Sequence, residues 1–279
     1  MDYNNIITGE KIQQLADVYL GIDGDFDFNP LIQQQYNKHL NIFDINTTFD
    51  NPYLIFCYTH NIDLLATKIH LFNNKFILIS HNSDGYISET QNIIHILNYP
   101  KLYKWYCQNL CFYHEKLFFI PIGIANRQWM HGDPRIFLNL SNNLLIKNKK
   151  IYFNFNIITN IPIRESCYYM LKDKLEWLEN IEPINNIARL SEYEFCICPE
   201  GHGPDTHRLW EALYVKTVPI VIDSDFTKTL IRNHVPLVVL SSWDELNIDE
   251  LDYTKYDFNN INLQSILYFD KLTLYIKGQ

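Results

Sequence analysis

The sequence contains no stretch of about 18 apolar residues, the length that a membrane-spanning helix needs. Its first five residues are polar and acidic, where a secretory signal would carry a basic stretch and then an apolar one. We therefore expect a soluble, cytoplasmic protein without a transmembrane segment. Basic residues are also few, with 23 Lys and Arg against 32 Asp and Glu and a net charge of −9. This balance argues against nucleic acid as a partner.

Several common motifs are missing. The sequence has neither the Gly-x-x-x-x-Gly-Lys-Ser/Thr of a P-loop nor the Gly-x-Gly-x-x-Gly of a dinucleotide-binding turn. None of the six cysteines forms a Cys-x-x-Cys pair, which argues against a zinc ribbon or a redox motif. Cys107 and Cys111 have the spacing of one helical turn, and Cys196 and Cys198 that of one strand face. We expect buried free thiols.

The apolar pattern predicts an α/β protein. Runs at 53–58, 76–80 and 117–122 read as buried strands, with a helical pattern over 62–72, while 93–97 and 102–110 are ambiguous. A second series follows, with strands at 151–157, 195–198, 220–222 and 237–240 and a helix over about 164–178. Strands that alternate with helices predict mainly parallel sheets.

The length of 279 residues favours about two domains. We expect a Rossmann-like N-terminal domain over 1–145 on the acceptor side, a linker over 141–150, and a Rossmann-like C-terminal domain over 146–262. The pattern over 263–276 predicts a helix in the final segment, 263–279. One possible position for this helix is against the N-terminal domain. Ligands of such sheets bind outside the carboxyl ends of the strands, which here places them in a cleft between the domains.

The segment 195–213 carries the strongest functional signal. An apolar strand breaks into Pro199-Glu200-Gly201-His202-Gly203-Pro204, and a helical pattern follows at once. Glycines let the backbone approach a ligand closely, and the N–H groups and dipole of a helix start favour negative charge. Asp205 and Thr206 are suited to cap this helix, which we expect to begin near His207 and to end before Pro219. The segment therefore predicts an anion-binding site.

Residues in this region resemble the exostosin-like glycosyltransferase family. The resemblance covers about 190–225 and consists of Cys198-Pro199-Glu200-Gly201, Asp205-Thr206, Arg208-x-x-Glu211-Ala212-Leu213 and Val218-Pro219-Ile220-Val221. It implies a GT-B fold and inverting, metal-independent transfer from a nucleotide sugar, with a UDP-sugar favoured, to a hydroxyl of a glycan acceptor. The C-terminal domain would hold the donor, and no cofactor is expected.

The sequence departs from the family at one place. The family has a glycine between this helix and the next strand, and Lys216-Thr217 stands there instead. A left-handed conformation at Lys216 would cost ~1 kcal/mol; the alternative is that this turn has a different geometry from that of the family.

The donor site is expected around Arg208 and Glu211, which lie three residues apart on one helix face. The arginine suits diphosphate oxygens and the carboxylate suits a ribose diol; the alternative is a surface ion pair of little energetic value. The resemblance suggests Arg164 as a second diphosphate contact, although Glu165 could instead neutralise it. The remaining candidates for donor binding are Thr159, Asn160, Pro199, Glu200, Gly201, His202, Gly203, Asp205, Thr206 and His207, with Glu200 and His202 suited to sugar hydroxyls.

An inverting transfer needs a base that deprotonates the acceptor hydroxyl. Asp84 is our first candidate, in the polar turn that follows the predicted strand 76–80, and His60 and His81 come next. The alternative is that Asp84-Gly85 only forms a turn. Three aromatic residues are candidates for stacking against a sugar: Tyr58, Tyr86 and Trp129.

Two acidic stretches invite a metal hypothesis. Asp223-Ser224-Asp225 imitates the metal motif of GT-A glycosyltransferases, and the aspartates at 23, 25 and 27 suggest calcium, but without the spacing of an EF-hand. We interpret both as solvated turns and expect no metal. Two other functions stay open: a non-catalytic module that binds a nucleotide sugar or a glycan, and a different α/β enzyme that binds a phosphorylated metabolite.

Overall fold

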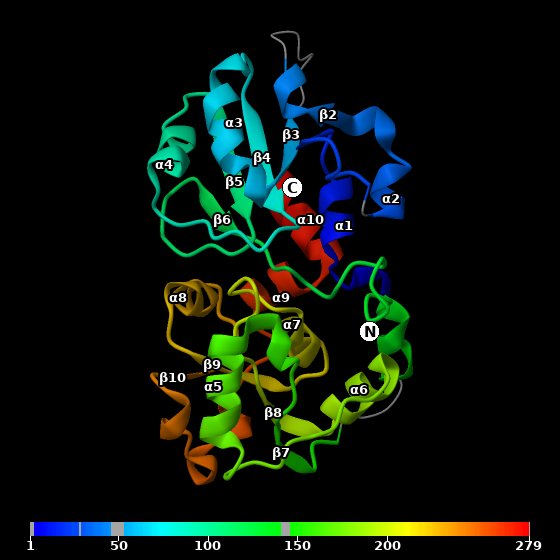
Figure 1. The fold of residues 1–279 in the computed structure, drawn as a ribbon, viewed down its shortest axis with the longest axis vertical. Coiled ribbons are helices and arrows are strands. Elements are labelled where there is room, and N and C mark those ends of the chain that lie inside the picture. Colours follow the sequence, from blue (N-terminus) through cyan, green and yellow to red (C-terminus); the bar gives the residue numbers. More distant parts are fainter. Residues whose placement is uncertain (1–2, 28, 46–52, 141–145, 279) are drawn as a thin grey trace.

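The computed structural model describes residues 3–27, 29–45, 53–140 and 146–278 and contains two parallel β-sheets with helices on their faces (Figure 1). The first sheet has six strands in the order β2-β1-β3-β4-β5-β6. Its strands are β1 Val18–Gly21, β2 His39–Asn41, β3 Leu54–Tyr58, β4 Phe76–His81, β5 Leu102–Cys107 and β6 Leu117–Phe119. The α/β class with mainly parallel sheets is confirmed, and each sheet is compatible with a Rossmann-like domain.

Alternating side chains along the strands bury both faces of the first sheet. In β3, Leu54, Phe56 and Tyr58 belong to one apolar cluster, whereas Ile55 and Cys57 belong to the other. The first cluster also contains apolar residues of α1, α2 and α10, and the second contains those of α3 and α4. The bounds are α1 Gly9–Gln14, α2 Pro30–Gln33, α3 Ile62–Lys68, α4 Gln91–Leu97 and α10 Phe269–Lys277.

The second sheet has four strands in the order β10-β9-β8-β7. The strands are β7 Lys149–Tyr152, β8 Tyr193–Ile197, β9 Val218–Ile222 and β10 Val238–Leu240, and the helices of this half are α5 Ile161–Leu171, α6 Pro183–Leu190, α7 His207–Tyr214, α8 Asp225–Arg232 and α9 Ile261–Leu267. Short 3-10 helices occupy Tyr3–Asn5, Tyr36–Lys38, Ile42–Asp44, Thr59–Asn61, Ile69–Leu71, Pro134–Leu140, Ile157–Asn160, Trp243–Glu245, Ile248–Glu250 and Tyr253–Lys255.

The structure adds two strands that the sequence pattern did not predict. β1 and β2 contain only four and three residues, too few for a clear alternation. Their position changes the topology, because β1 lies between β2 and β3 and the strand order therefore reverses between β1 and β3. In an open parallel sheet, such a reversal marks a ligand-binding crevice.

Other boundaries also differ from prediction. The helix expected over 164–178 is α5, which begins at Ile161 and ends at Leu171. The helix expected over 263–276 is interrupted at Tyr268, whose extended backbone separates α9 from α10. Of the expected linker 141–150, residues 141–145 lie outside the described part of the chain, and Lys149 already begins β7.

Segments far apart in the sequence hold the two halves together. α10 lies against the first sheet (Figure 1), where the Tyr106 hydroxyl donates a hydrogen bond to the Tyr275 carbonyl. Tyr214 of α7 accepts a hydrogen bond from the Ile7 amide at 2.9 Å and donates one to the Leu267 carbonyl. The buried hydroxyl of Tyr214 thus connects α7 to the start of the chain and to α9.

The structure also tests the predictions for Lys216, for the cysteines and for membrane-spanning helices. Lys216 has a φ of 56° and therefore adopts the left-handed conformation, which costs about 1 kcal/mol relative to glycine. All six cysteines are free thiols, five of them buried and Cys111 half-buried. Cys107 is the last residue of β5, so the helical interpretation of its spacing from Cys111 is wrong. Within the described ranges, no helix combines the length and apolar character needed to cross a membrane.

Candidate functional site

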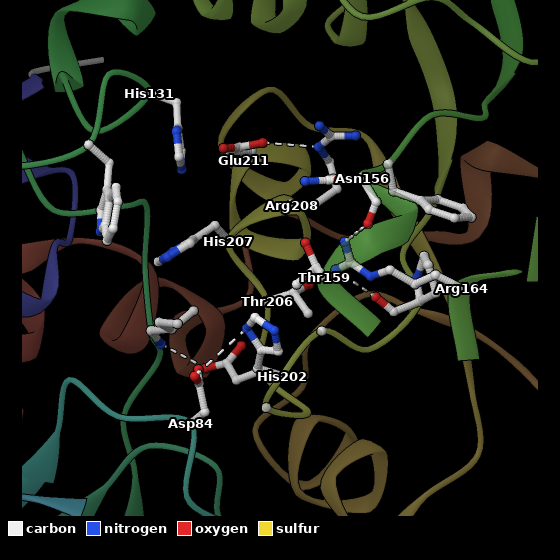
Figure 2. A pocket seen from close by; sticks show the side chains of 17 residues that line it. Asp84, His131, Asn156, Thr159, Arg164, His202, Thr206, His207, Arg208 and Glu211 are labelled. Carbon is white, nitrogen blue, oxygen red and sulfur yellow. Dashed lines mark hydrogen bonds and ion pairs between the residues drawn. The ribbon is translucent and has the colours of Figure 1, made fainter. Parts of the chain in front are cut away.

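A cleft of about 470 Å³ opens beside the start of α7 (Figure 2). Its walls come from the loop between β8 and α7, from the segment 155–164, and from the facing half at Asp84, Ile122 and Trp129. The cleft therefore lies at the carboxyl end of β8, as expected for a parallel sheet. The lining residues are Asp84, Ile122, Trp129, His131, Phe155, Asn156, Thr159, Arg164, Pro199, Gly201, His202, Gly203, Asp205, Thr206, His207, Arg208 and Glu211.

The glycine loop approaches the facing half of the molecule closely at Gly203. A Cβ there would lie 3.0 Å from Asn109 Nδ2 and 3.1 Å from the Asp84 carbonyl oxygen. Asn109 also accepts a hydrogen bond from the Asp205 amide through Oδ1. The absence of a side chain at Gly203 therefore lets the loop pack closely against the facing half of the molecule.

Arg164 clamps the same loop from the other side. Its Nε donates to the Glu200 carbonyl at 2.8 Å and its Nη1 to the Asn156 carbonyl at 2.7 Å. Asn160 Nδ2 donates to the Gly201 carbonyl at 2.6 Å. Arg164 and Asn160 thus fix the backbone of the loop, and Arg164 also lines the cleft.

Asp205 joins the two halves and does not cap α7. Its carboxylate accepts hydrogen bonds from the Ile122 amide at 2.7 Å and from Trp210 Nε1 at 2.6 Å. Burial raises the pKa of Asp205 to about 7, against the opposing effect of these hydrogen bonds. Thr206 occupies the N-cap position of α7 but makes no capping bond with its side chain. The predicted start of the helix is correct, and the predicted side-chain caps are wrong.

Arg208 and Glu211 form a buried ion pair, so the surface-pair alternative is wrong. Arg208 Nε lies 3.0 Å from Glu211 Oε2, and the two side chains are 19% and 9% exposed. Arg208 Nη1 donates to the Asn154 carbonyl, and the guanidinium lies over the ring of Tyr152. Burial lowers the pKa of Arg208, but the charge of Glu211, the neighbouring Cys196 and Tyr152, and the hydrogen bond to Glu211 together outweigh burial and raise it overall.

Of the two arginines that line the cleft, Arg208 is paired with Glu211, whereas Arg164 is not, although Asp84 and Asp205 also line the cleft. Arg164 is only 8% exposed, and it forms no ion pair with a carboxylate of the described residues. Burial, together with a smaller repulsion by Arg208, lowers its pKa to about 10. Arg164 is still charged at neutral pH, and a buried charge without a counterion is costly. The pair of arginines therefore favours an anionic ligand.

His207 is held in one tautomer at the wall of the cleft. Its Nδ1 lies 2.9 Å from the Gly123 carbonyl, which can only accept, so Nδ1 carries the proton and Nε2 carries the lone pair. Burial lowers the pKa of the ring. His207 is thus a neutral hydrogen-bond acceptor at neutral pH.

Asp84 lies where the cleft meets a second cavity of about 360 Å³. Four residues line both spaces: Asp84, Ile122, Trp129 and His207. Figure 2 shows Asp84 opposite His202, and the closest oxygen–nitrogen distance between them is 4.0 Å. Asp84 is 66% exposed, so its carboxylate is accessible from both spaces.

Several predicted site residues lie elsewhere. His81 is fully buried, and its ring bonds the Pro121 carbonyl and Asn82, so it cannot reach an acceptor. His60 lines only the second cavity. Glu200 lines a separate small cavity beside α8, and Asn160 supports the loop without lining the cleft. The other predicted donor-site residues line the cleft: Thr159, Arg164, Pro199, Gly201, His202, Gly203, Asp205, Thr206, His207, Arg208 and Glu211.

The burial of His81 has a consequence for acid stability. Burial lowers its pKa from 6.5 to about 4, so the unfolded chain binds a proton more readily than the folded one. The stability that the neutral ring contributes is present above pH 6.5 and is lost as the pH falls toward 4. Urea unfolding at pH 7 and at pH 5 measures this effect. Between these two pH values, we expect the free energy of unfolding to fall by about 2 kcal/mol more in the native protein than in His81→Gln. An equal loss in both proteins would contradict this role.

The structure adds residues that the sequence did not mark. His131, Phe155 and Asn156 line the cleft, but they stand in no recognisable motif, and only the folded chain brings them to Arg208. Of the three aromatic candidates, Trp129 lines both spaces, Tyr58 is buried against Gln13 and lines the second cavity, and Tyr86 lines neither.

The two acidic stretches have structural roles. Ser224 caps α8 and Asp225 pairs with Lys228 in its first turn. Asp25 accepts hydrogen bonds from the Ile22 amide and from Asn61. Among the described residues, no group of three or more His, Cys, Asp or Glu side chains is arranged to hold a metal ion.

In comparisons with known proteins, the chain matches no protein-family model and no curated protein sequence.

Proposed function

We propose that this protein is an inverting glycosyltransferase that moves a sugar from a nucleotide sugar, with a UDP-sugar favoured, to a hydroxyl of a glycan acceptor. The observation that carries the proposal is that Arg164, a buried cation without an ion-pair partner among the described residues, lies beside Arg208 in a cleft at the start of α7. A diphosphate would supply the missing negative charge. Two parallel sheets on either side of this cleft agree with a GT-B architecture.

The donor would lie along the start of α7. The first turn of this helix and Arg208 would hold the diphosphate, while Arg164 keeps the loop in place and adds positive potential. Glu211 uses Oε2 for Arg208 and would accept hydrogen bonds from the ribose hydroxyls through its other oxygen. These roles assign the nucleotide to the C-terminal half.

Transfer would take place near Asp84, because this carboxylate lines both spaces. The acceptor oxygen attacks the anomeric carbon while its O–H bond breaks and the proton passes to Asp84. The bond from the anomeric carbon to the diphosphate breaks on the opposite face, and its electron pair leaves with the nucleoside diphosphate. The two arginines and the helix dipole would stabilise that leaving group, so we expect transfer without a metal.

A ligand screen tests this function. We expect nucleoside diphosphates and nucleotide sugars, with UDP and GDP forms compared, to raise the melting temperature of the full-length protein. We expect hydrolysis or transfer of one donor to persist in EDTA. Binding without any turnover would favour the non-catalytic module. Strict manganese dependence would overturn the metal-independent mechanism. Stabilisation only by simple phosphorylated metabolites would favour a different α/β enzyme.

A further inference from the structure

The second cavity lies at the point where the strand order of the first sheet reverses. β1 neighbours β2 on one side and β3 on the other, and the carboxyl ends of β1 and β3 lead to Asp25 and His60. These two side chains meet across the reversal, with His60 Nε2 2.9 Å from Asp25 Oδ1. Both line the cavity of about 360 Å³. Topology and cavity thus coincide at a place where parallel sheets bind ligands.

The lining of this cavity differs in charge from that of the donor cleft. It includes neither Lys nor Arg, whereas the cleft contains Arg164 and Arg208. Its carboxylates are Asp25 and Asp84, of which Asp84 also lines the cleft. An anionic group would find no cationic partner here. The two spaces are therefore suited to ligands of different charge, although they share a wall.

Carboxamides dominate the polar lining. Six of them line the cavity: Gln13, Asn29, Asn82, Gln108, Asn126 and Gln128. A carboxamide both donates and accepts hydrogen bonds, and so does a hydroxyl group. Four of the six are held by hydrogen bonds. Asn82 Nδ2 donates to Gln13 Oε1 at 2.8 Å, and Gln13 Nε2 donates to the Tyr58 hydroxyl at 2.9 Å. Behind the wall, Glu10 accepts from Asn29 Nδ2 at 2.8 Å and donates its amide to Asn126 Oδ1 at 2.9 Å. The wall is therefore pre-organised.

Gln108 and Gln128 point to a missing partner. The Oε1 atom of each is buried and has no hydrogen-bond partner among the described residues, and Gln108 as a whole is only 1% exposed. A buried acceptor left without a donor destabilises the fold, and a ligand hydroxyl that reached these oxygens would remove that cost. His60 bonds Asp25 through Nε2, and its Nδ1 has no hydrogen bond to another described residue.

Trp129 completes the arrangement. Its side chain is 56% exposed although it lines both spaces, so a large aromatic face is available to a ligand at their junction. An aromatic face suits the apolar C–H face of a sugar ring. Asp84 stands at the same junction.

We infer that the second cavity binds the acceptor, and that this acceptor is a neutral saccharide end whose hydroxyls bond Gln108 and Gln128 and whose ring lies against Trp129. The inference rests on the proposed function for the identity of the ligand as an acceptor. It adds the chemical class: an uncharged sugar, and not a sugar phosphate or a uronic acid. Asp84 at the junction then lies within reach of a hydroxyl that projects toward the donor.

Saccharide binding can be tested without a donor. Saturation-transfer NMR on the full-length protein would compare maltose, lactose, cellobiose and chitobiose with glucose 6-phosphate and glucuronic acid. We expect at least one neutral disaccharide to bind, and both charged sugars to bind at least about tenfold more weakly. No binding by any neutral sugar of the panel, or stronger binding by a charged one, would overturn the inference.

Gln108→Leu provides the decisive variant, because it removes the carboxamide and keeps the side-chain volume close to that of glutamine. We expect the melting temperature to stay the same or to rise, and saccharide affinity to fall at least about tenfold. Gln14→Leu, in α1 and outside the cavity, is the matched control and should change neither. Unchanged saccharide affinity in Gln108→Leu would show that the buried amide has no binding role.

The same proteins separate this inference from the proposed function. UDP stabilisation should be equal in the native protein and in Gln108→Leu, because Gln108 does not line the donor cleft. UDP binding without saccharide binding would refute the acceptor site and leave the donor site standing. Saccharide binding without any nucleotide binding would refute the proposed transferase.

Discussion

Replacing Asp84 with Asn is expected to slow sugar transfer by a factor of about 10²–10⁴ and to leave nucleotide affinity unchanged. Asn keeps the size of the side chain but cannot take up the proton of the acceptor hydroxyl. Asp84 lines both spaces without contacting Arg164 or Arg208, so donor binding should not depend on its charge. Transfer rates at saturating donor, together with UDP affinity from calorimetry, measure the two effects separately.

Asp225→Asn is the matched control for this experiment. Asp225 is 69% exposed, close to the 66% of Asp84, but it lies on α8 outside both spaces. Its replacement should leave transfer unaffected. If Asp84→Asn retains the native rate while His207→Gln loses it, the base is the histidine, whose Nε2 lone pair lines the same junction.

Arg208→Met is expected to abolish nucleotide binding and to destabilise the fold by about 3–5 kcal/mol. The substitution removes the guanidinium proposed to hold the diphosphate. It also leaves Glu211, whose side chain is 9% exposed, as a buried carboxylate without its partner. Urea unfolding measures the loss of stability, and calorimetry with UDP measures the loss of binding.

A double variant separates these two losses. In Arg208→Met with Glu211→Leu, no unpaired charge stays in the helix, so we expect most of the stability to return. Nucleotide binding should stay absent, because the anion site depends on the guanidinium. Recovery of UDP affinity in the double variant would contradict the assigned role of Arg208, and so would unchanged affinity in the single one.

Much of the C-terminal half could be predicted from local sequence. The strand, the glycine loop and the helix from His207 appear where the pattern placed them, because each depends on neighbours within a few residues. The spacing of Arg208 and Glu211 also fixed their pairing on one helix face. The left-handed Lys216 was one of two possibilities for the end of that helix, and only the structure decides between them.

The N-terminal half shows where such patterns fail. β1 and β2 are too short to give a period, so the reversal of strand order between β1 and β3 was not predicted. The turn after β4 was identified as a source of candidate bases, but sequence could not distinguish buried His81 from exposed Asp84. That distinction depends on which distant segment packs against each side chain. The segment around Pro121 packs against His81, whose ring bonds the Pro121 carbonyl.

The sequence by itself determined the chemical character of the donor loop: glycines, a helix start, and an Arg and a Glu on one face. The tertiary structure decided what surrounds that loop. Asp205 bonds an amide 83 residues away, Arg164 binds the loop carbonyls, and Asp25 meets His60 at a reversal of strand order. The physical reason is range. Backbone conformation and helix periodicity are set over a few residues, whereas burial, ion pairing and cavities arise only when distant segments pack together.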